Sequence, residues 1–334
     1  MTSHLAIFIC PACEGEIRII GDNIKCLKCH NRYKVEDEIP LLFCPNEWDQ
    51  GKGDVTDTIK SFYEKTPFPN YEDSDDVDSL IQKAERGIFA HLLNEQTPFN
   101  IKALEVGCGT GQLSNFLGIS QRYVFATDMC LNSLKLGQNF KIRNGLERVG
   151  FYQMNLFKPI FRKESFDLVI CNGVLHHTSN PFLGFQSIAR LVKKGGYIIV
   201  GLYNKYGRFI TDIRRLLFNI SGDRFKFSDP RLRKKDNSEI RKSTWFKDQY
   251  KNPHESKHTI GEILKWFDET GIEFVNSIIP KAKPFVDFSE EEKLFRPNPR
   301  GTWLDHFFVQ SKLLLSGSRE GGFFLMIGQK NLNI

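Results

Sequence analysis

From residue 100 to residue 203, short apolar runs alternate with segments of helical periodicity. The first apolar run, residues 103–106, enters a glycine-rich turn, and the pattern predicts a helix from near Gln112. Four more strands are expected within the stretches RYVFATDMC, VGFYQMNLF, SFDLVICNGVLHH and KKGGYIIVGLY. Strands that alternate with helices predict an α/β fold with a parallel sheet, right-handed crossovers and a ligand across the carboxyl ends of the strands.

Further elements flank this region. Apolar residues recur at helical spacing over residues 78–95, which predicts one helix with Asp78 as its N-cap. Another helix is expected over residues 260–270, because Thr259 and Glu262 have the spacing of a capping box. The stretches IEFVNSIIP and GGFFLMIGQK are expected to be the last two strands.

The composition is that of an ordinary globular protein, with 40% hydrophobic and 26% charged residues among 334. The length suffices for one large domain or two smaller ones. The start of the sequence, MTSHLAIFICPAC, lacks a basic segment, and its apolar run is too short for a signal peptide. No stretch approaches the ~18 apolar residues of a membrane span. Together with eight Cys, four of them in C-x-x-C pairs, this predicts a cytoplasmic protein with metal-bound thiolates.

Two C-x-x-C pairs lie near the start of the chain. Each pair can bring two thiolates onto one metal, and together Cys10, Cys13, Cys26 and Cys29 predict a closed, tetrahedral and therefore structural Zn²⁺ site. A segment of roughly 40 residues buries little surface, so the metal would supply much of its stability. His30 and Cys44 are weaker candidate ligands. The layout CPxC…CxxC…Y…EIPLL resembles the small zinc domain of activators of tRNA and protein methyltransferases, and the zinc ribbons that precede some rRNA methyltransferases.

A second metal-like pattern, H-E-x-x-H, occupies residues 254–258. In metalloproteases both His of this pattern share one helical face. Pro253 disfavours a helix through the pattern, and the predicted helix begins only at Thr259. The pattern therefore does not indicate a protease. Four residues of this region are instead candidates to face a substrate pocket: Asp248, Tyr250, His254 and Glu255.

The turn after the first strand carries the most specific chemistry. Gly107, Gly109 and Gly111 allow positive φ and close approach of a ligand to the backbone, and the next helix offers free N–H groups. The final glycine of G-x-G-x-x-G is missing, which disfavours a dinucleotide. Glu105 inside the motif favours S-adenosylmethionine (SAM), and Asp128 at the end of the next strand is placed to accept hydrogen bonds from ribose hydroxyls.

The motifs LEVGCGTGQ, ATD, FDLVICNGVLHH and LVKKGGYIIVG, in this order and spacing, resemble those of the class I SAM-dependent methyltransferases. The resemblance implies a Rossmann-like, doubly wound seven-stranded sheet whose last two strands are an antiparallel pair. It implies that the glycine turn and Glu105 line the methionine and ribose of SAM, that Met129 packs against adenine, and that Asn155 faces the adenine amino group. The implied cofactor-binding residues are Glu105, Gly107, Cys108, Gly109, Gly111, Asp128, Met129, Asn155, Leu156, Asn172 and Gly173.

The fourth-strand motif bears on the substrate. NGVLHH stands where N/D-P-P-Y/F marks many methyltransferases that modify exocyclic or amide nitrogens, and it resembles small-molecule C- and O-methyltransferases, including those of quinone biosynthesis. His176 or His177 could act as a general base, or could pack and shape the pocket. The catalytic candidates are His176, His177, Tyr250 and His254.

Two insertions extend the methyltransferase pattern, at residues 204–258 and 281–320. From Lys205 to Lys251 there are 14 Lys and Arg against 6 Asp and Glu, a net charge of +8 in a chain of net charge +6. One helical face carries Phe209, Ile210, Ile213, Leu216, Leu217 and Ile220. We expect this helix to pack over the substrate pocket as a lid; the alternatives are a basic surface for RNA, an anionic substrate or a membrane. The second insertion is expected to add another helix over the pocket or to form a dimer contact.

The sequence therefore predicts a zinc-ribbon-like module over residues 1–45, a linker over 46–77 and a methyltransferase domain over 78–334. The expected function is methyl transfer from SAM to a carbon or oxygen atom of a small molecule. The alternative is an RNA methyltransferase that uses the zinc module and the basic insertion to dock tRNA or rRNA, with Arg233, Lys234 and Lys235 among the phosphate-binding candidates. A non-catalytic partner subunit is disfavoured by the complete SAM motif.

Overall fold

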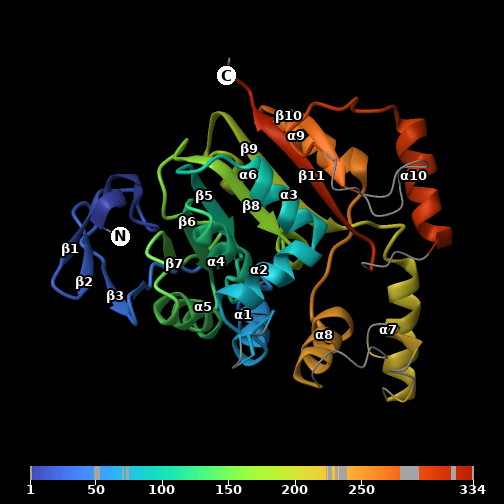
Figure 1. Ribbon diagram of the computed structural model, residues 1–334, viewed down its shortest axis with the longest axis horizontal. Helices are drawn as coiled ribbons and strands as arrows, with labels where there is room; N and C mark the ends of the chain where they lie inside the picture. Colours follow the sequence, from blue (N-terminus) through green and yellow to red (C-terminus); the bar gives the residue numbers. More distant parts are fainter. Residues whose placement is uncertain are drawn as a thin grey trace.

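A seven-stranded sheet runs through the centre of the computed structural model (Figure 1), which describes residues 2–48, 53–69, 71–72, 75–222, 224, 228–229, 232, 239–278, 293–316 and 321–332. Its order is β10-β11-β9-β8-β5-β6-β7, and only β11 runs antiparallel to its neighbours. The expected seven-stranded methyltransferase sheet with its final antiparallel pair is confirmed. The strands are β5 (Lys102–Val106), β6 (Tyr123–Asp128), β7 (Val149–Gln153), β8 (Phe166–Asn172), β9 (Val192–Tyr203), β10 (Ile272–Ile278) and β11 (Phe323–Lys330).

Helices cover both faces of the sheet, which explains the nearly continuous apolar runs of its parallel strands. Alternate strand residues enter different cores: Val124 and Ala126 pack with α4 (Gln112–Ile119) and α5 (Leu131–Arg143), whereas Phe125 belongs to the cluster that contains α6 (Pro181–Ala189) and α9 (Ile260–Thr270). The Thr259 hydroxyl caps α9 by accepting the Glu262 N–H at 3.2 Å, as the capping pattern predicts.

The region predicted as one helix over residues 78–95 forms two helices. α2 (Val77–Arg86) begins after Asp76, whose carboxylate accepts the Ser79 N–H at 2.8 Å in a capping box, so the expected Asp78 cap is wrong. Gly87 has extended backbone angles and separates α2 from α3 (Ile88–Gln96). Periodicity alone did not show this break, because the apolar residues on both sides of Gly87 keep helical spacing.

The N-terminal module has a 3-10 helix, η1 (Thr2–Ile7), and an antiparallel sheet in the order β1-β2-β3-β4. Its strands are β1 (Ile17–Ile20), β2 (Asn23–Cys26), β3 (Arg32–Glu36) and β4 (Ile39–Pro40). The module lies beside the edge strand β7 (Figure 1), where the Leu42 N–H donates to the Gln153 carbonyl at 3.1 Å. The buried Phe8 ring lies 4.9 Å from the Phe161 ring and 5.0 Å from the Tyr152 ring, so the module shares the core of the large sheet.

The segment expected to be a linker contains a helix, α1 (Thr56–Lys65). Near its end the Glu64 carboxylate accepts the N–H groups of Leu131 and Asn132, at 2.8 and 3.0 Å. Those N–H groups belong to the first turn of α5, which has no side-chain cap of its own. The segment therefore supplies the hydrogen-bond acceptors for the free N–H groups at the start of α5, and it is part of the fold.

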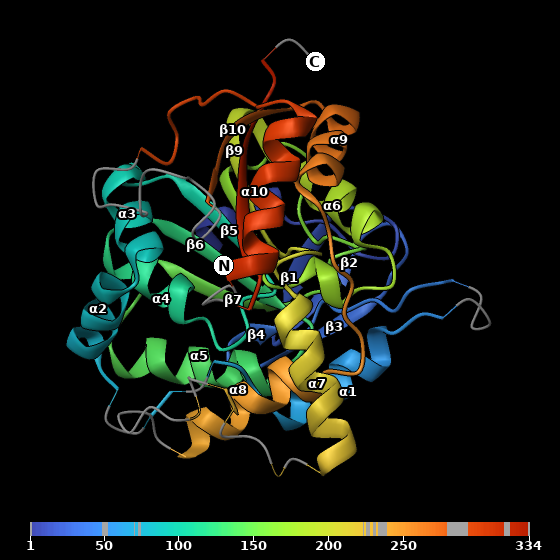
Figure 2. The same ribbon diagram turned by 90° about the vertical axis from the view of Figure 1, so that its right-hand side faces the viewer.

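The insertions add α7 (Phe209–Ser221), α8 (Glu239–Lys251) and α10 (Trp303–Ser316), which lie on one side of the molecule (Figure 2). The expectation that α7 packs over the substrate pocket as a lid is wrong, because no residue of α7 lines the cavity. Of the predicted apolar face, Ile210 is half-buried and the other members are exposed, whereas Phe218 on the opposite side is buried against Phe246 and Tyr250 of α8. Arg233, Lys234 and Lys235, and residues 281–292 and 317–320 of the second insertion, lie outside the described residues. No helix of the described part is both long and apolar enough to cross a membrane.

Candidate active site

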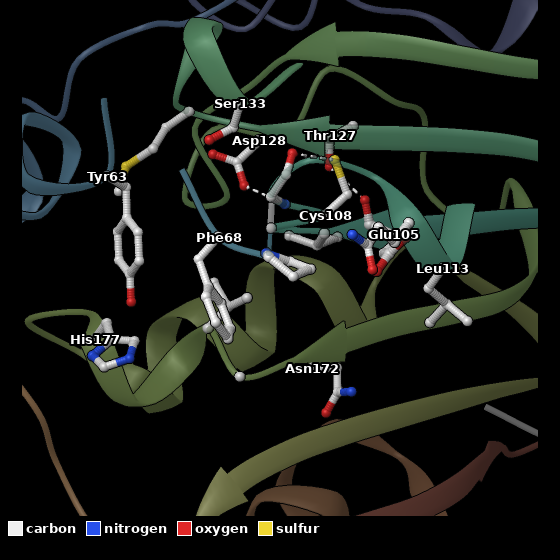
Figure 3. A pocket seen from close by; sticks show the side chains of 18 of the residues that line it. Tyr63, Phe68, Glu105, Cys108, Leu113, Thr127, Asp128, Ser133, Asn172 and His177 are labelled. Carbon is white, nitrogen blue, oxygen red and sulfur yellow. Dashed lines mark hydrogen bonds between the residues drawn. The ribbon is translucent and has the colours of Figure 1, made fainter. Parts of the chain in front are cut away.

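A cavity of about 510 Å³ lies at the carboxyl ends of β5, β6 and β8 (Figure 3). Its walls combine the glycine turn after β5 with α1, α2 and α8, so segments far apart in the sequence enclose it. The lining is largely apolar and includes Ile59, Leu80, Leu113, Phe116, Met154 and Phe323. This is the position predicted for a ligand of a doubly wound sheet.

The glycine turn gives the cavity a wall of bare backbone. Gly107 and Gly109 have φ of 71° and 55°, values that side-chain-bearing residues rarely adopt. A Cβ at Gly107 would lie 2.3 Å from a methyl carbon of Val174, and one at Gly109 would lie 2.1 Å from the Phe68 carbonyl oxygen. Gly111 differs from the prediction, because it lies outside the cavity lining and packs against Phe151, 2.4 Å from where its Cβ would be.

Two carboxylates face the turn, the buried Glu105 and the half-buried Asp128. Asp128 accepts the Gly109 N–H at 2.9 Å and the Cys130 N–H at 2.8 Å, and Glu105 accepts a hydrogen bond from the Ser114 hydroxyl. Burial, with a smaller contribution from the repulsion between the two carboxylates, raises the pKa of Glu105 to about 7, and burial raises the pKa of Asp128 to about 6. No Lys or Arg of the described residues forms an ion pair with either one. The pair suits a ligand that carries positive charge and hydroxyl groups, as SAM does.

The other predicted cofactor residues divide into two groups. Cys108, Met129, Leu156, Asn172 and Gly173 line the cavity, and the buried Asn172 Oδ1 has no hydrogen-bond partner among the described residues. Asn155 also lines the cavity, but its amide N–H groups donate to the Cys44 carbonyl at 2.9 Å and to Asn46 Oδ1 at 2.8 Å, and its oxygen accepts the Phe157 N–H. Asn155 therefore anchors the segment after the N-terminal module, which sequence reasoning missed.

Among the catalytic candidates, only His177 lines the cavity. Its Nδ1 lies 2.7 Å from the His254 carbonyl oxygen. Because a carbonyl only accepts, Nδ1 carries the proton and Nε2 holds a lone pair. Burial lowers the pKa of His177, partly offset by the nearby Asp248 carboxylate, so the ring is neutral at neutral pH. The Nε2 atom is therefore able to accept a proton.

The remaining catalytic candidates lie elsewhere. The buried His176 ring packs 4.3 Å from the Tyr203 ring, and neither of its nitrogens has a hydrogen-bond partner in the described part of the chain. Tyr250 donates its hydroxyl to Asp229 at 2.8 Å within the contact between α7 and α8. His254 Nε2 lies 3.1 Å from the Thr178 carbonyl, and His254 reaches the site only through its own backbone carbonyl. The structure thus does not bring these three side chains into the cavity lining.

Sequence reasoning missed Tyr63, which closes the cavity from α1 (Figure 3). The Tyr63 hydroxyl donates to Asp248 at 2.7 Å and accepts from Asn252 Nδ2 at 2.9 Å. Asp248, a pocket candidate from the sequence, lines the cavity, and its second oxygen accepts from Gln249 at 2.8 Å. The aromatic run SFYEKTPFP was the available signal, but nothing in it indicated a partner 185 residues away.

The four predicted metal ligands come together in the N-terminal module. The sulfur atoms of Cys10, Cys13, Cys26 and Cys29 all lie within 4.8 Å of one another. The Cys10–Cys29 and Cys13–Cys26 pairs are separated by 3.6 and 3.5 Å, close to the ~3.8 Å between thiolates at ~2.3 Å from a tetrahedral zinc. This donor set fits Zn²⁺. His30 and Cys44 are not members of the group, and neither is the H-E-x-x-H stretch.

Comparison with known proteins agrees with this fold. Residues 104–200 match a family model described as a methyltransferase domain. An uncharacterized protein from Synechococcus is 25% identical over 198 residues, covering 52% of this chain and 48% of that protein. The ubiquinone biosynthesis O-methyltransferase of Haemophilus ducreyi is 30% identical over 111 residues, covering 32% of this chain and 47% of that protein. The chain thus spans about half the length of the curated relatives it matches.

Solved structures align with this chain at low sequence identity. A complex between the Haloferax volcanii Trm112 methyltransferase activator and a methyltransferase aligns with TM-score 0.46 and 12% identity, covering 75% of this chain and 93% of the matched chain. The motifs, the sheet order and the family match over residues 104–200 all agree. Residues 104–200 thus match a methyltransferase domain within a sheet of the class I SAM-dependent methyltransferase type, and four cysteines gather in the N-terminal module.

Proposed function

We propose that this protein transfers a methyl group from SAM to a hydroxyl oxygen of a small, largely apolar molecule. The observation that carries the proposal is His177, which has Nδ1 bonded to the His254 carbonyl and therefore presents an unprotonated Nε2 in an apolar cavity. A neutral base of lowered pKa suits removal of a hydroxyl proton near neutral pH. The similarity to ubiquinone biosynthesis O-methyltransferases supports an oxygen acceptor.

The cofactor is proposed to lie along the glycine turn. Asp128 would accept hydrogen bonds from the ribose hydroxyls, and Glu105 would face the positively charged methionine portion. Met129 and Leu156 would supply apolar surface for adenine, while Asn172 and Gly173 would border the methyl group. When bound, SAM would supply an activated methyl carbon for transfer to the acceptor oxygen, with SAH as the leaving product.

The residues of this chain then position the acceptor and move its proton. The acceptor hydroxyl gives its proton to His177 Nε2, and the His254 carbonyl keeps the ring oriented through Nδ1. Asp248 stabilises the resulting imidazolium, since its charge favours the protonated form of His177. Tyr63 and Gln249 hold Asp248 in place through their hydrogen bonds.

We also infer that Cys10, Cys13, Cys26 and Cys29 hold one structural Zn²⁺, and that residues 1–45 form the module that this ion stabilises. The distances between the sulfur atoms support the inference. Four thiolates close the coordination shell, so the ion has no open position for a substrate.

Binding of S-adenosylhomocysteine (SAH), the product form of the cofactor, tests the SAM site. We expect isothermal titration calorimetry to detect SAH binding by the purified protein, and Asp128→Ala to weaken it by about tenfold or more, because a charged acceptor of hydrogen bonds is lost. Glu85→Ala, which removes an exposed carboxylate from α2, should leave the affinity unchanged. Undiminished binding by Asp128→Ala would contradict the assignment.

Substitution of His177 tests the chemical step. His177→Ala should reduce methyl transfer by about a hundredfold or more while SAH affinity stays within twofold (about 0.4 kcal/mol) of the wild type. With SAM saturating, so that titration of Glu105 and Asp128 does not limit cofactor binding, the wild-type rate should be constant near neutral pH. It should fall only in acid, as the pH drops through the lowered pKa of His177. The assay uses tritiated SAM with separate lipid and RNA extracts of the cells that make the protein.

His91→Ala, on α3 and away from the cavity, is the matched control and should be fully active. Label that appears in the RNA extract would refute the small-molecule acceptor. An unchanged rate for His177→Ala would refute only the role of the base.

A further inference from the structure

The helix α7 leaves a row of large apolar side chains in solvent. Leu216 and Ile220 are 62% and 78% exposed, and the row continues through Phe209, Ile213 and Leu217. The helix does have a packed side, where Phe218 is buried against Phe246 and Tyr250. The exposed row is therefore a second apolar surface on the same helix, one that the fold does not cover within the described residues.

The helix α10 carries a matching row. Trp303 is 72% exposed and Phe308 62%, and Leu304 and Phe307 are also exposed, whereas Leu313 is buried. Figure 1 places α10 and α7 one after the other along the same edge of the molecule, and Figure 2 shows both helices toward the viewer. We define the α7–α10 apolar face as the exposed apolar residues of these two helices: Phe209, Ile213, Leu216, Leu217, Ile220, Trp303, Leu304, Phe307 and Phe308. Exposed apolar patches of this kind mark contact sites.

Positive charge borders this face. Lys205 precedes α7, Arg224 follows it and Lys312 lies on α10, and all three side chains are exposed. Lys205 and Arg224 belong to residues 205–251, whose sequence has a net charge of +8. Asp305 on α10 is the exposed carboxylate within the described part of these two helices, so positive charge remains in excess. An isologous dimer would bring this positive surface against its own copy. A bilayer that contains anionic lipid offers the opposite charge, and aromatic and aliphatic side chains flanked by Lys and Arg are typical of helices that lie in a membrane interface.

We propose that the α7–α10 apolar face docks the protein on an anionic phospholipid bilayer, with both helices lying in the interfacial plane. The docking does not depend on the chemistry of the cavity. The further step, that the methyl acceptor comes from the bilayer, rests on the proposed function. The strand β9 ends at Tyr203, a cavity residue, shortly before α7, and α10 precedes Phe323, another cavity residue whose ring lies 5.7 Å from that of Tyr203. The docked face is therefore joined to the cavity wall, which suits an acceptor with an apolar body drawn from the bilayer.

Flotation with lipid vesicles tests the docking. We expect the purified zinc-loaded protein to float with vesicles of equal parts phosphatidylcholine and phosphatidylglycerol, and to bind vesicles of phosphatidylcholine alone at least about tenfold more weakly. Leu216→Gln with Ile220→Gln, and separately Trp303→Ser with Phe308→Ser, should each reduce binding to the anionic vesicles by about tenfold or more. Each pair of substitutions removes two apolar side chains that would enter the bilayer on docking.

The chain offers a matched control at its other end. Ile20 and Leu27 are exposed apolar residues of the N-terminal module, on the side opposite α7 and α10 in Figure 1, so Ile20→Gln with Leu27→Gln should bind vesicles like the wild type. SAH titration checks that each variant is folded and separates this test from that of the proposed function. Wild-type protein that does not float with anionic vesicles, or variants that float as well as the wild type, would overturn the proposal. So would a dimer in analytical ultracentrifugation that the same substitutions abolish.

Discussion

Removal of metal from the N-terminal module is expected to abolish SAH binding, although the thiolates lie outside the cavity. Phe8 and Leu42 of the module are fully buried in the same core as the central sheet. The Leu42 N–H donates to the Gln153 carbonyl of the edge strand β7. The Cys44 carbonyl accepts a hydrogen bond from Asn155 at the cavity wall. Loss of the module would expose this core and release that wall.

The size of the effect follows from what zinc contributes to small modules. Zinc binding supplies about 10–16 kcal/mol in zinc-finger peptides, comparable to or larger than the whole stability of a typical domain, about 5–15 kcal/mol. Cys13→Ser with Cys29→Ser should therefore release the metal and lower the melting temperature by about 10 °C or more. Calorimetric SAH titration before and after chelation, and again after zinc is restored, measures the coupling. Cys44→Ser, outside the group of four, is the control and should retain metal and affinity. Metal loss with unchanged SAH affinity would show that the module is independent.

The parts of the site that the sequence predicted well are those contained in one continuous stretch. Glu105, the glycine turn and Asp128 lie at the ends of adjacent parallel strands, and each strand is followed by its own turn. Local periodicity and the residues of the turn were therefore sufficient to place them. The same holds for the rejected H-E-x-x-H pattern, because the local capping of α9 by Thr259 decided where the helix begins.

What the sequence did not predict depends on contacts between distant segments. Tyr63 and Asp248 meet only because α1 and α8 enclose the same cavity. The apolar periodicity of α7 correctly predicted an amphipathic helix, but periodicity does not show which side the rest of the chain covers. The side that packs contains Phe218, and the longer apolar row is left in solvent. Expectation and structure differ at α7 for this reason.

Substitution of Arg208 is expected to cause a loss of stability of about 3–5 kcal/mol, because it would leave the Glu255 carboxylate buried without a counter-charge. The two side chains are each 1% exposed and form a bidentate pair with N–O distances of 2.8 and 2.5 Å. Arg208 also donates to Gln249 Oε1 at 2.6 Å and lies 3.7 Å from the centre of the Tyr203 ring. The pair thus ties the start of α7 to two residues of the cavity wall.

Urea unfolding of a double-mutant cycle measures this contribution. Arg208→Met alone should be strongly destabilised, whereas Arg208→Met with Glu255→Leu should recover most of the loss, since an apolar pair removes the unpaired charge. Arg300 and Asp268 form a bidentate pair of similar geometry, but their side chains are 46% and 55% exposed, so Arg300→Met should cost less than about 1 kcal/mol. Equal losses at the buried and exposed pairs would contradict the expectation. Because Gln249 holds Asp248 beside His177, Arg208→Met should also slow methyl transfer more than it weakens SAH binding.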